Sequence, residues 1–334
     1  MSHGRVIDIH CHRECGPAAA LVKPESERLG RKPFSFGNDL TREVNRKQLE
    51  DIRPKMESVE VRLADMDATG IDVQAISLSP YQLFHWAEGD PGVRAFKLAN
   101  DDLAGLVGEH PDRLVGLGAI PLQDPPAAID ELRRCVVELG FRGVEMATHI
   151  EGEELSSPRF ESFWETVEDL GVLVFIHPTG FTEPARFTDH YFFNTIGHPL
   201  EETLCAGRLI FDGVMERHPG LKFVFSHGGG FLPAYAGRFD HAYHARADVR
   251  HGLPRPPSEY LSMFFFDTMV FEADQLGFLI DKYGSDHILL GTDYPYDMGE
   301  TDPLGLINKV SGLSPDNVDL IVGGNAARLL GIER

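Results

Sequence analysis

The first apolar run of the chain, VIDIHCH at residues 6–12, has the pattern of a buried β-strand and ends in two histidines. A strand sends residues i and i+2 to the same face, so His10 and His12 are expected to point together and Cys11 to point away. Two adjacent neutral imidazoles can bind zinc or a related divalent ion. Because the chain holds 15 histidines in 334 residues, such a pair also arises by chance, and other residues must decide between the two interpretations.

Seven further apolar runs follow, and their dense Val, Ile, Leu and Phe content is typical of parallel strands covered on both faces. Together with residues 5–9, the expected strands are 73–79, 114–120, 141–147, 172–177, 221–226, 263–267 and 287–292. Helical patterns lie between them at 92–110, 126–139, 159–170, 199–217, 230–246 and 272–283. Eight such alternations predict an α/β fold, a (β/α)₈ TIM barrel. A doubly wound open sheet is the alternative, but no G-x-G-x-x-G follows the first strand, since GLGAIP at 116–121 does not fit.

Two connections are too long for simple turns. They span residues 13–60, after the first strand, and 178–197, after the fifth. Long irregular loops in a compact domain are usually functional, and both leave the strand ends where barrel enzymes place their sites. We therefore expect one barrel domain over residues 1–334, with 13–60 as a lid-like insertion.

The charge and composition indicate which kinds of molecule this protein can bind. The formal net charge is −21, from 31 basic and 52 acidic residues, which argues against nucleic acid or an anionic membrane surface but not against a small anionic substrate. The four cysteines form no CxxC pair, which favours reduced thiols. The chain enters a strand at once, without a signal-like core or a run of 18 apolar residues, so a cytoplasmic protein is expected.

Polar residues gather at the predicted carboxyl ends of the strands, which meet at one mouth of a barrel. His10 and His12 end the first strand, His177 the fifth and His227 the sixth, and Asp293 follows the eighth. Each alone could be a buried structural residue or, for Asp293, a turn residue. Five of them at one mouth predict a mononuclear metal site of His10, His12, His177 and Asp293, with His227 as a proton-transfer group.

The fourth strand decides between one metal ion and two. Barrel hydrolases with two ions often bridge them by a modified lysine there, but FRGVEMATH at 141–149 contains no lysine and offers only Glu145 and His149. One ion with open positions for water and substrate is therefore expected. Asp267, at the end of the seventh strand, is expected to support a metal ligand rather than bind the ion itself.

The run HGGG at 227–230 has two interpretations. Its glycines allow tight packing of a helix on a strand, or they present backbone N–H groups to an anion. A serine hydrolase oxyanion motif looks similar, but no G-x-S-x-G accompanies it, which excludes that chemistry.

As an ordered set, DIHCH, IHP, FSHGGG…GRFD, PRPPSEY, FFFDT and LLGTDYP…MG resemble the amidohydrolase superfamily, within it the group around aminocarboxymuconate-semialdehyde decarboxylase. The likeness runs from about residue 5 to GNAARLLGI at 324–332. It implies the same four metal ligands and His227 as the catalytic histidine. In a decarboxylation, either Asp293 or His227 is expected to protonate the substrate carbon. Members of the group include zinc or manganese decarboxylases of aromatic and ring-opened acids, a hydratase and lactone hydrolases.

The resemblance also assigns substrate-binding residues. Arg53, in IRP at 52–54, matches an arginine that binds the substrate carboxylate. Arg238, in AGRFD, matches a second arginine that reaches the pocket from the neighbouring subunit, which implies a homodimer. Trp86, in FHWAEGD at 84–90, is placed near the pocket. The chain departs from the group at Thr179-Gly180, where the decarboxylase has tryptophan after its HP, and this leaves the substrate open.

The expected function is non-oxidative decarboxylation of an unsaturated or aromatic carboxylic acid. One divalent ion per chain is expected, zinc first and manganese as the alternative. Hydrolysis or hydration of a lactone, amide or alkene at the same ion is the second hypothesis. A non-catalytic metal-binding scaffold is the third, and His227, which that role would not need, argues against it.

Overall fold

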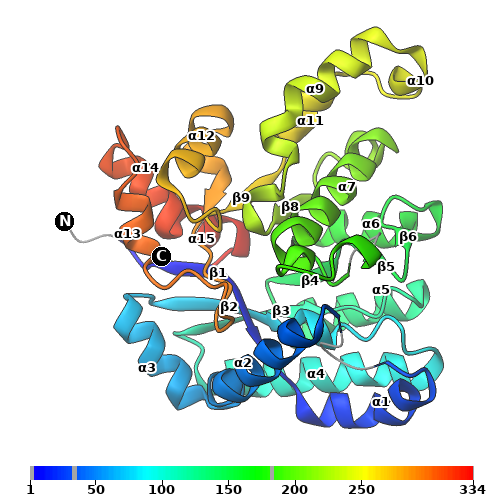
Figure 1. Cartoon of the computed structure of the whole chain (residues 1–334), viewed down its shortest axis with the longest axis vertical. Coiled ribbons are helices and arrows are strands. Elements are labelled where there is room, and N and C mark those ends of the chain that lie inside the picture. The colour runs from blue at the N-terminus through cyan, green and yellow to red at the C-terminus, as the bar shows by residue number, and fades with distance from the viewer. Residues whose placement is uncertain (1–3, 32–35, 181–183, 334) are drawn as a thin grey trace.

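Eight parallel strands form one sheet in the computed structural model, which describes residues 4–31, 36–180 and 184–333 (Figure 1). The strands, in spatial order, are β1 (Ile7–Arg13), β2 (Val73–Leu78), β3 (Leu114–Ala119), β4 (Gly143–Ala147), β7 (Leu173–His177), β8 (Lys222–Phe225), β9 (Phe265–Asp267) and β10 (Ile288–Leu289). Each falls on one of the eight predicted runs. A separate antiparallel pair, β5 (His149–Ile150) and β6 (Glu153–Glu154), follows β4.

The sheet curls until its first and last strands meet. The Ile9 amide donates to the Leu290 carbonyl over 2.9 Å, and the His12 amide donates to the Tyr294 carbonyl over 2.8 Å. Cys11 and Tyr294 also form a parallel bridge. The predicted TIM barrel is therefore confirmed, and the carboxyl end of β1 lies beside the segment that carries Asp293.

A register shift in β1 aims its histidines into the barrel. Ile7 and Ile9 pack in the inner core with residues of the other strands and of α15 (Asn325–Leu330), whereas Cys11 belongs to the outer core beneath the helices. Strict alternation from Ile9 would therefore place His10 outside. The pairing with β2 shifts between Asp8 and Cys11, and a bulge of this kind re-aims the side chains that follow it. His10 and His12 consequently face the interior together.

Helices surround the barrel (Figure 1). They are α1 (Gly16–Arg28), α2 (Asp39–Glu57), α3 (Val59–Thr69), α4 (Gly89–Glu109), α5 (Pro125–Arg133), α6 (Glu161–Leu170), α7 (His198–Phe211), α8 (Val214–Arg217), α9 (Leu232–Ala245), α10 (Ala247–Arg250), α11 (Pro257–Leu261), α12 (Ala273–Tyr283), α13 (Pro303–Asn308), α14 (Pro315–Asp319) and α15. The helix predicted at 199–217 is broken at Gly213, whose φ is 80°. Within the described ranges, none of these helices has the length and apolar character needed to cross a membrane.

The connection at 13–60, expected as an irregular loop, is mostly helical. Asn38 caps α2 by accepting from the Thr41 amide, and the pairs Arg46–Glu50 and Lys47–Asp51 support the helix surface. The expectation was wrong because the buried face of α2 includes polar residues, Asn45 and Gln48, so it shows no apolar stripe. In the connection at 178–197, residues 181–183 lie outside the described residues, and Phe193–Gly197 form a π-turn that leads into α7.

Close packing between β3 and the chain that enters β4 gives a test of the barrel. A Cβ at Gly116 would lie 2.4 Å from a ring carbon of Phe141, so Gly116→Ala forces the ring to move and should lower the free energy of unfolding by about 1–3 kcal/mol. A Cβ added at Gly105 in α4 would have no atom within 4 Å, so Gly105→Ala should raise the free energy of unfolding by about 0.5–1 kcal/mol. Denaturant unfolding of the two variants should therefore shift in opposite directions. Equal stability of the two would contradict the packing described.

Candidate metal centre

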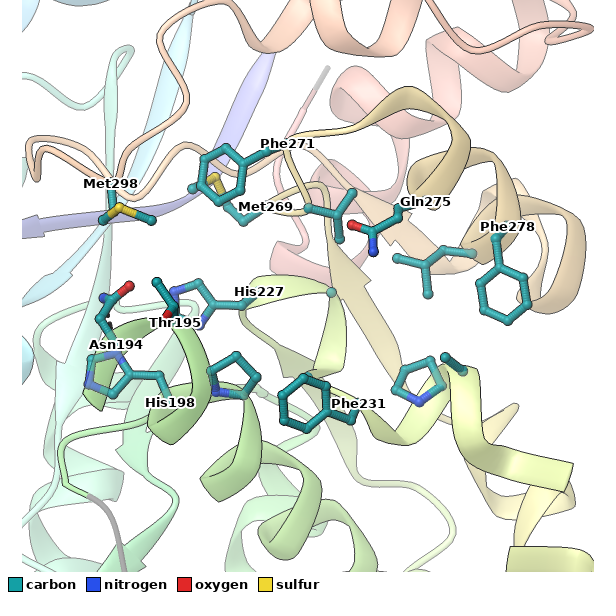
Figure 2. A pocket seen from close by; sticks show the side chains of 17 residues that line it. Asn194, Thr195, His198, His227, Phe231, Met269, Phe271, Gln275, Phe278 and Met298 are labelled. Carbon is teal, nitrogen blue, oxygen red and sulfur yellow. Dashed lines mark hydrogen bonds between the residues drawn. The ribbon is translucent and has the colours of Figure 1, made fainter. Parts of the chain in front are cut away.

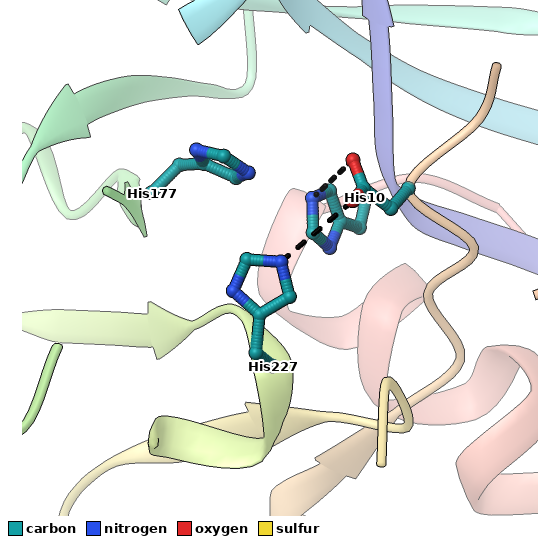
Figure 3. Close-up of side chains that lie close together, drawn as sticks. His10, His177 and His227 are labelled. Atoms are coloured by element: carbon teal, nitrogen blue, oxygen red, sulfur yellow. Dashed lines mark ion pairs between the residues drawn. The ribbon is translucent and has the colours of Figure 1, made fainter. Parts of the chain in front are cut away.

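Four histidine rings and one carboxylate converge at the carboxyl end of the barrel. His10 and His12 lie in β1, His177 ends β7, His227 follows β8, and Asp293 lies beyond β10. The ring of His10 is 5.1 Å from those of His12 and His177 and 5.3 Å from that of His227, between centroids. Figure 3 shows His10, His177 and His227 turned toward a common point. The structure thus brings together all five residues that the strand ends predicted.

Each imidazole is held through its Nδ1 atom. The partners are Asp267 Oδ2 for His10 at 2.7 Å, Ser77 Oγ for His12 at 3.0 Å, the Pro178 carbonyl for His177 at 2.8 Å, and Glu202 Oε1 for His227 at 2.9 Å. The carbonyl and the carboxylates can only accept, and the Ser77 hydroxyl donates to the Cys11 carbonyl. We therefore assign the proton to Nδ1 in each ring, which leaves Nε2 as the free ligand atom.

The inner atoms fit a divalent cation. The Nε2 atoms of His10, His12 and His177 and the Oδ1 atom of Asp293 are buried and have no hydrogen-bond partner among the described residues. Asp293 Oδ1 lies 3.3 Å from Nε2 of both His10 and His12. Two ligands that each lie about 2.0–2.1 Å from one tetrahedral ion are about 3.3 Å apart. Buried, unpaired donors of these types at this spacing fit a site for a divalent metal ion.

His227 lies as close to the centre as the predicted ligands. Donor atoms of His10, His177, His227 and Asp293 all lie within 4.8 Å of one another, and His227 Nε2 is 3.7 Å from Asp293 Oδ2. The geometry alone therefore allows His227 to bind an ion. Its assignment as a proton-transfer group, with His12 as the third histidine ligand, stays a prediction.

The electrostatics of the cluster favour a positive charge at its centre. Burial lowers the pKa of His10, but the charge of Asp293 and the hydrogen bond with Asp267 outweigh it and raise that pKa to about 9. Burial alone raises the pKa of Asp293, yet the charge of His10 holds it well below its usual range. Burial lowers the pKa of His12 to about 4, which keeps this ring neutral and ready to ligate. An ionised Asp293 inside the barrel thus requires a cation beside it.

Packing, rather than anion binding, explains the HGGG turn. Gly228, Gly229 and Gly230 all have positive φ, and a Cβ at Gly230 would lie 2.2 Å from the Pro199 carbonyl oxygen. Their amides are committed to Asp267 Oδ1, the Ser226 carbonyl and the His227 carbonyl, at 2.9, 2.8 and 3.2 Å. The anion-binding interpretation was therefore wrong. Asp267 contacts both this turn and His10, so it supports the metal centre as predicted.

On the fourth strand, Glu145 lies beside the cluster of histidines. Its Oε2 atom is 3.9 Å from His12 Nδ1, and burial raises its pKa to about 8. His149 lies in the β5–β6 hairpin, with Nε2 3.8 Å from Glu201 Oε2.

Two cavities adjoin the centre. The inner one is lined by His177 and Asp293 and, around them, by Gln48, Tyr81, Tyr191, Asn194, His198, Tyr296 and Asp297. The outer one, of about 320 Å³, is mainly apolar and reaches His227 and His198 (Figure 2). Its walls include Phe231 just before α9, Met269 and Phe271 after β9, and Phe278 of α12. No lysine or arginine lines either cavity in the part of the chain that the structure describes.

The three residues assigned to substrate binding by resemblance lie outside these cavities. Arg53 is exposed on α2, near Glu14, and Arg238 is exposed on α9. Trp86 is half-buried and lines a separate surface hollow with Gln123, while the Arg31 guanidinium stacks 5.2 Å from its ring centroid. Their roles toward substrate stay predictions.

Sequence reasoning missed most of the cavity walls and one buried carboxylate. Tyr296 stands three residues after Asp293, and following the last loop further would have found it. Gln48 and Glu202 lie inside α2 and α7, where no motif marks them.

Comparison with known proteins agrees with this arrangement. The Amidohydrolase family (Amidohydro_2) matches residues 7–332. The chain belongs to this family. It is 35% identical over 275 residues to 2-amino-3-carboxymuconate-6-semialdehyde decarboxylase of Dictyostelium discoideum, covering 82% of this chain and 77% of that protein. It is 33% identical over 262 residues to gamma-resorcylate decarboxylase of Rhodococcus jostii, covering 71% and 77%.

A solved structure of similar shape contains a metal ion. The dihydroxybenzoic acid decarboxylase of Polaromonas sp. JS666, with bound manganese and the inhibitor 2-nitroresorcinol, has a TM-score of 0.82 and 26% identity to this chain. The similarity covers 99% of this chain and 98% of that one. The predicted group of decarboxylases is thereby confirmed as the group that this amidohydrolase resembles.

The Asp267 contact gives a test of the metal centre. Asp267→Ala removes the partner of His10 Nδ1 and of the Gly228 amide, so metal affinity should fall by about 10–100-fold. Competition with a chelator of known affinity measures this. Asp274→Ala, at an exposed position in α12, should leave the affinity unchanged. Unaltered affinity in Asp267→Ala would show that His10 is not a ligand or needs no support.

Proposed function

We propose that this amidohydrolase is a metal-dependent non-oxidative decarboxylase, a carboxy-lyase acting on an aromatic or unsaturated carboxylic acid. The observation that carries the proposal is the convergence of His10, His12, His177, Asp293 and His227 on a cavity walled by phenol and amide side chains. The two relatives described above are both named as decarboxylases, one of a ring-opened acid and one of an aromatic acid. They support decarboxylation over hydrolysis or hydration.

His10, His12, His177 and Asp293 would hold one divalent ion per chain. Their nitrogen and oxygen donors suit zinc, which remains the first expectation, and manganese is the ion bound in the Polaromonas enzyme. When bound, the ion supplies positive charge that polarises a substrate oxygen and stabilises negative charge.

Decarboxylation requires a proton at the carbon that loses the carboxyl group. In the proposed reaction this carbon accepts a proton, its bond to the carboxylate then breaks, and the bonding electrons return to the ring or alkene as carbon dioxide leaves. Burial lowers the pKa of His227, but the charge of Glu202 outweighs it and holds that pKa well above the usual range. Asp293 remains ionised. His227 is therefore the group best suited to donate the proton, which stays on the product carbon, while the ionised Asp293 would orient the substrate.

The substrate carboxylate needs positive charge that the described cavity walls do not supply. The metal ion provides part of it, and we assign the rest to Arg53 and to Arg238 of the partner subunit, whose planar guanidinium groups bind carboxylates in a bidentate manner. Arg53 lies on α2, the helix that also carries Gln48 of the inner cavity wall, in keeping with a lid-like role for residues 13–60.

A second copy of this chain is proposed to cover the apolar rim of the outer cavity. Phe231, Phe271 and Phe278 line this cavity and are 40, 45 and 42% exposed, and Tyr235 of α9 is 57% exposed. Exposed apolar side chains of this kind are what subunit contacts cover. Figure 1 shows α9, which carries Tyr235 and Arg238, projecting from the barrel with α10. A projecting helix can reach a neighbouring pocket, so this geometry supports a homodimer. The four free, buried cysteines support a reducing, cytoplasmic setting.

Carbon dioxide release tests the function. Metal-loaded protein incubated with hydroxybenzoates and with unsaturated dicarboxylates should release one carbon dioxide per acid consumed. His227→Ala should keep its metal and slow this release by about 10²–10⁴-fold, because it removes the proton donor. His251→Ala, at an exposed position after α10, is the matched control and should retain full activity.

Two results would contradict this account. A product that has gained one water without loss of carbon dioxide would make the protein a hydratase or hydrolase. Loss of the metal in His227→Ala would make His227 a ligand.

Subunit complementation tests the role of Arg238. Arg238→Ala and His227→Ala chains should each be nearly inactive, but mixed dimers contain one pocket with an intact His227 and an intact Arg238 from the partner subunit. Activity should return to about a quarter of wild type if exchange is statistical and the pockets are independent. Arg246→Ala, at the exposed end of α9, should remain active alone. No recovery despite proven subunit exchange would place Arg238 outside the neighbouring site.

A further inference from the structure

We infer that Glu202 of α7 is a positioning residue that fixes the ring orientation and tautomer of His227. The inference rests on the proposed function, in which His227 donates a proton through Nε2. In this inference, Glu202 is the group that keeps Nε2 of His227, rather than Nδ1, facing the metal centre.

The contacts of Glu202 point to His227 and its neighbour in the chain. Glu202 is fully buried, and its Oε1 atom lies 2.9 Å from His227 Nδ1. The same oxygen accepts a hydrogen bond from the Ser226 hydroxyl. An ionised carboxylate only accepts, so it selects the tautomer with a proton on Nδ1. His227 Nε2, 3.7 Å from Asp293 Oδ2, is then the atom that exchanges a proton at the site.

The ring of His227 has room to leave this orientation if Glu202 is removed. His227 lines the outer cavity of about 320 Å³, so one side of the ring is not packed against protein (Figure 2). The ring of His198 stacks loosely on it, with 6.3 Å between centroids, and the rings of His10 and His177 lie edge-on at 5.3 and 5.2 Å. Glu202 contributes the hydrogen bond that holds Nδ1, and none of these ring contacts distinguishes Nδ1 from Nε2.

A purely structural role explains Glu202 poorly. Its second oxygen, Oε2, is buried and has no hydrogen-bond partner among the described residues. A buried carboxylate with one oxygen unsatisfied is costly to retain. Its neighbour Glu201 is also buried but lies near His149, away from the centre, which makes it a matched comparison on the same helix.

The test is Glu202→Gln in the metal-loaded enzyme, with Glu201→Gln as control. The amide keeps the side-chain volume but presents both a donor and an acceptor, so both tautomers of His227 become accessible. We expect kcat to fall by about 10–100-fold while KM and metal content stay near wild type. In the zinc-loaded protein, at a pH high enough to leave the His227 ring neutral, its ¹⁵N signals should change from the pure Nδ1–H form to a mixture. Glu201→Gln should alter neither.

A second variant separates positioning from other effects. In a His227→Ala background, Glu202→Gln should cause no further loss, because Glu202 acts only through that ring. An equal further loss, or an unchanged tautomer in Glu202→Gln, would overturn the inference. If Glu202→Gln does not fold, Glu202→Asp, which withdraws the carboxylate by one methylene, carries the same expectation. Absence of carbon dioxide release by the wild type would count against the proposed function alone, since the ¹⁵N measurement still tests the contact.

Discussion

An ionised carboxylate buried among imidazoles is the constraint on which the site depends. Asp293 is 6% exposed and lies at the mouth of an apolar barrel, where a lone charge is strongly disfavoured. Positive charge must therefore stand beside it, from His10 or from a bound cation. The Nδ1 partners of four rings come from four different parts of the chain, and each turns an Nε2 atom toward the same centre. The fold orients the imidazole rings, and the buried charge of Asp293 provides affinity for a cation.

A buried hydrogen-bond network next to the site fixes the position of Asp293. Asp8 accepts hydrogen bonds from the Thr292 amide and hydroxyl and from the Gln74 side chain, which ties β1 to β2 and to the segment before Asp293. The buried Arg62 of α3 donates to Gln74 and to the His12 carbonyl. This network holds Asp293 at a φ of 55°, an uncommon conformation for a residue other than glycine. These hydrogen bonds compensate the strain at Asp293, and they form between protein groups without a metal ion.

Much of this arrangement could be predicted from the sequence because the signals are local. Eight apolar runs predicted the strands, and the residues at their carboxyl ends predicted the five side chains that meet at the metal centre. The bulge in β1 could not be predicted, since it depends on pairing with β2, and it decides which face carries His10. The helix α2 lacks an apolar stripe, and Glu202 looks like any other helix glutamate until β8 is packed against α7. Residues whose role arises from tertiary contacts left no pattern to find.

The central claim is that three histidines and Asp293 hold one ion while His227 stands free to transfer a proton. Anomalous diffraction at the absorption edge of the bound metal, from crystals of the loaded enzyme, tests it most directly. The account predicts one ion per chain, bonded to Nε2 of His10, His12 and His177 and to the carboxylate of Asp293, with His227 Nε2 outside bonding distance. Two ions per chain, or an ion bonded to His227 with His12 unbound, would contradict it.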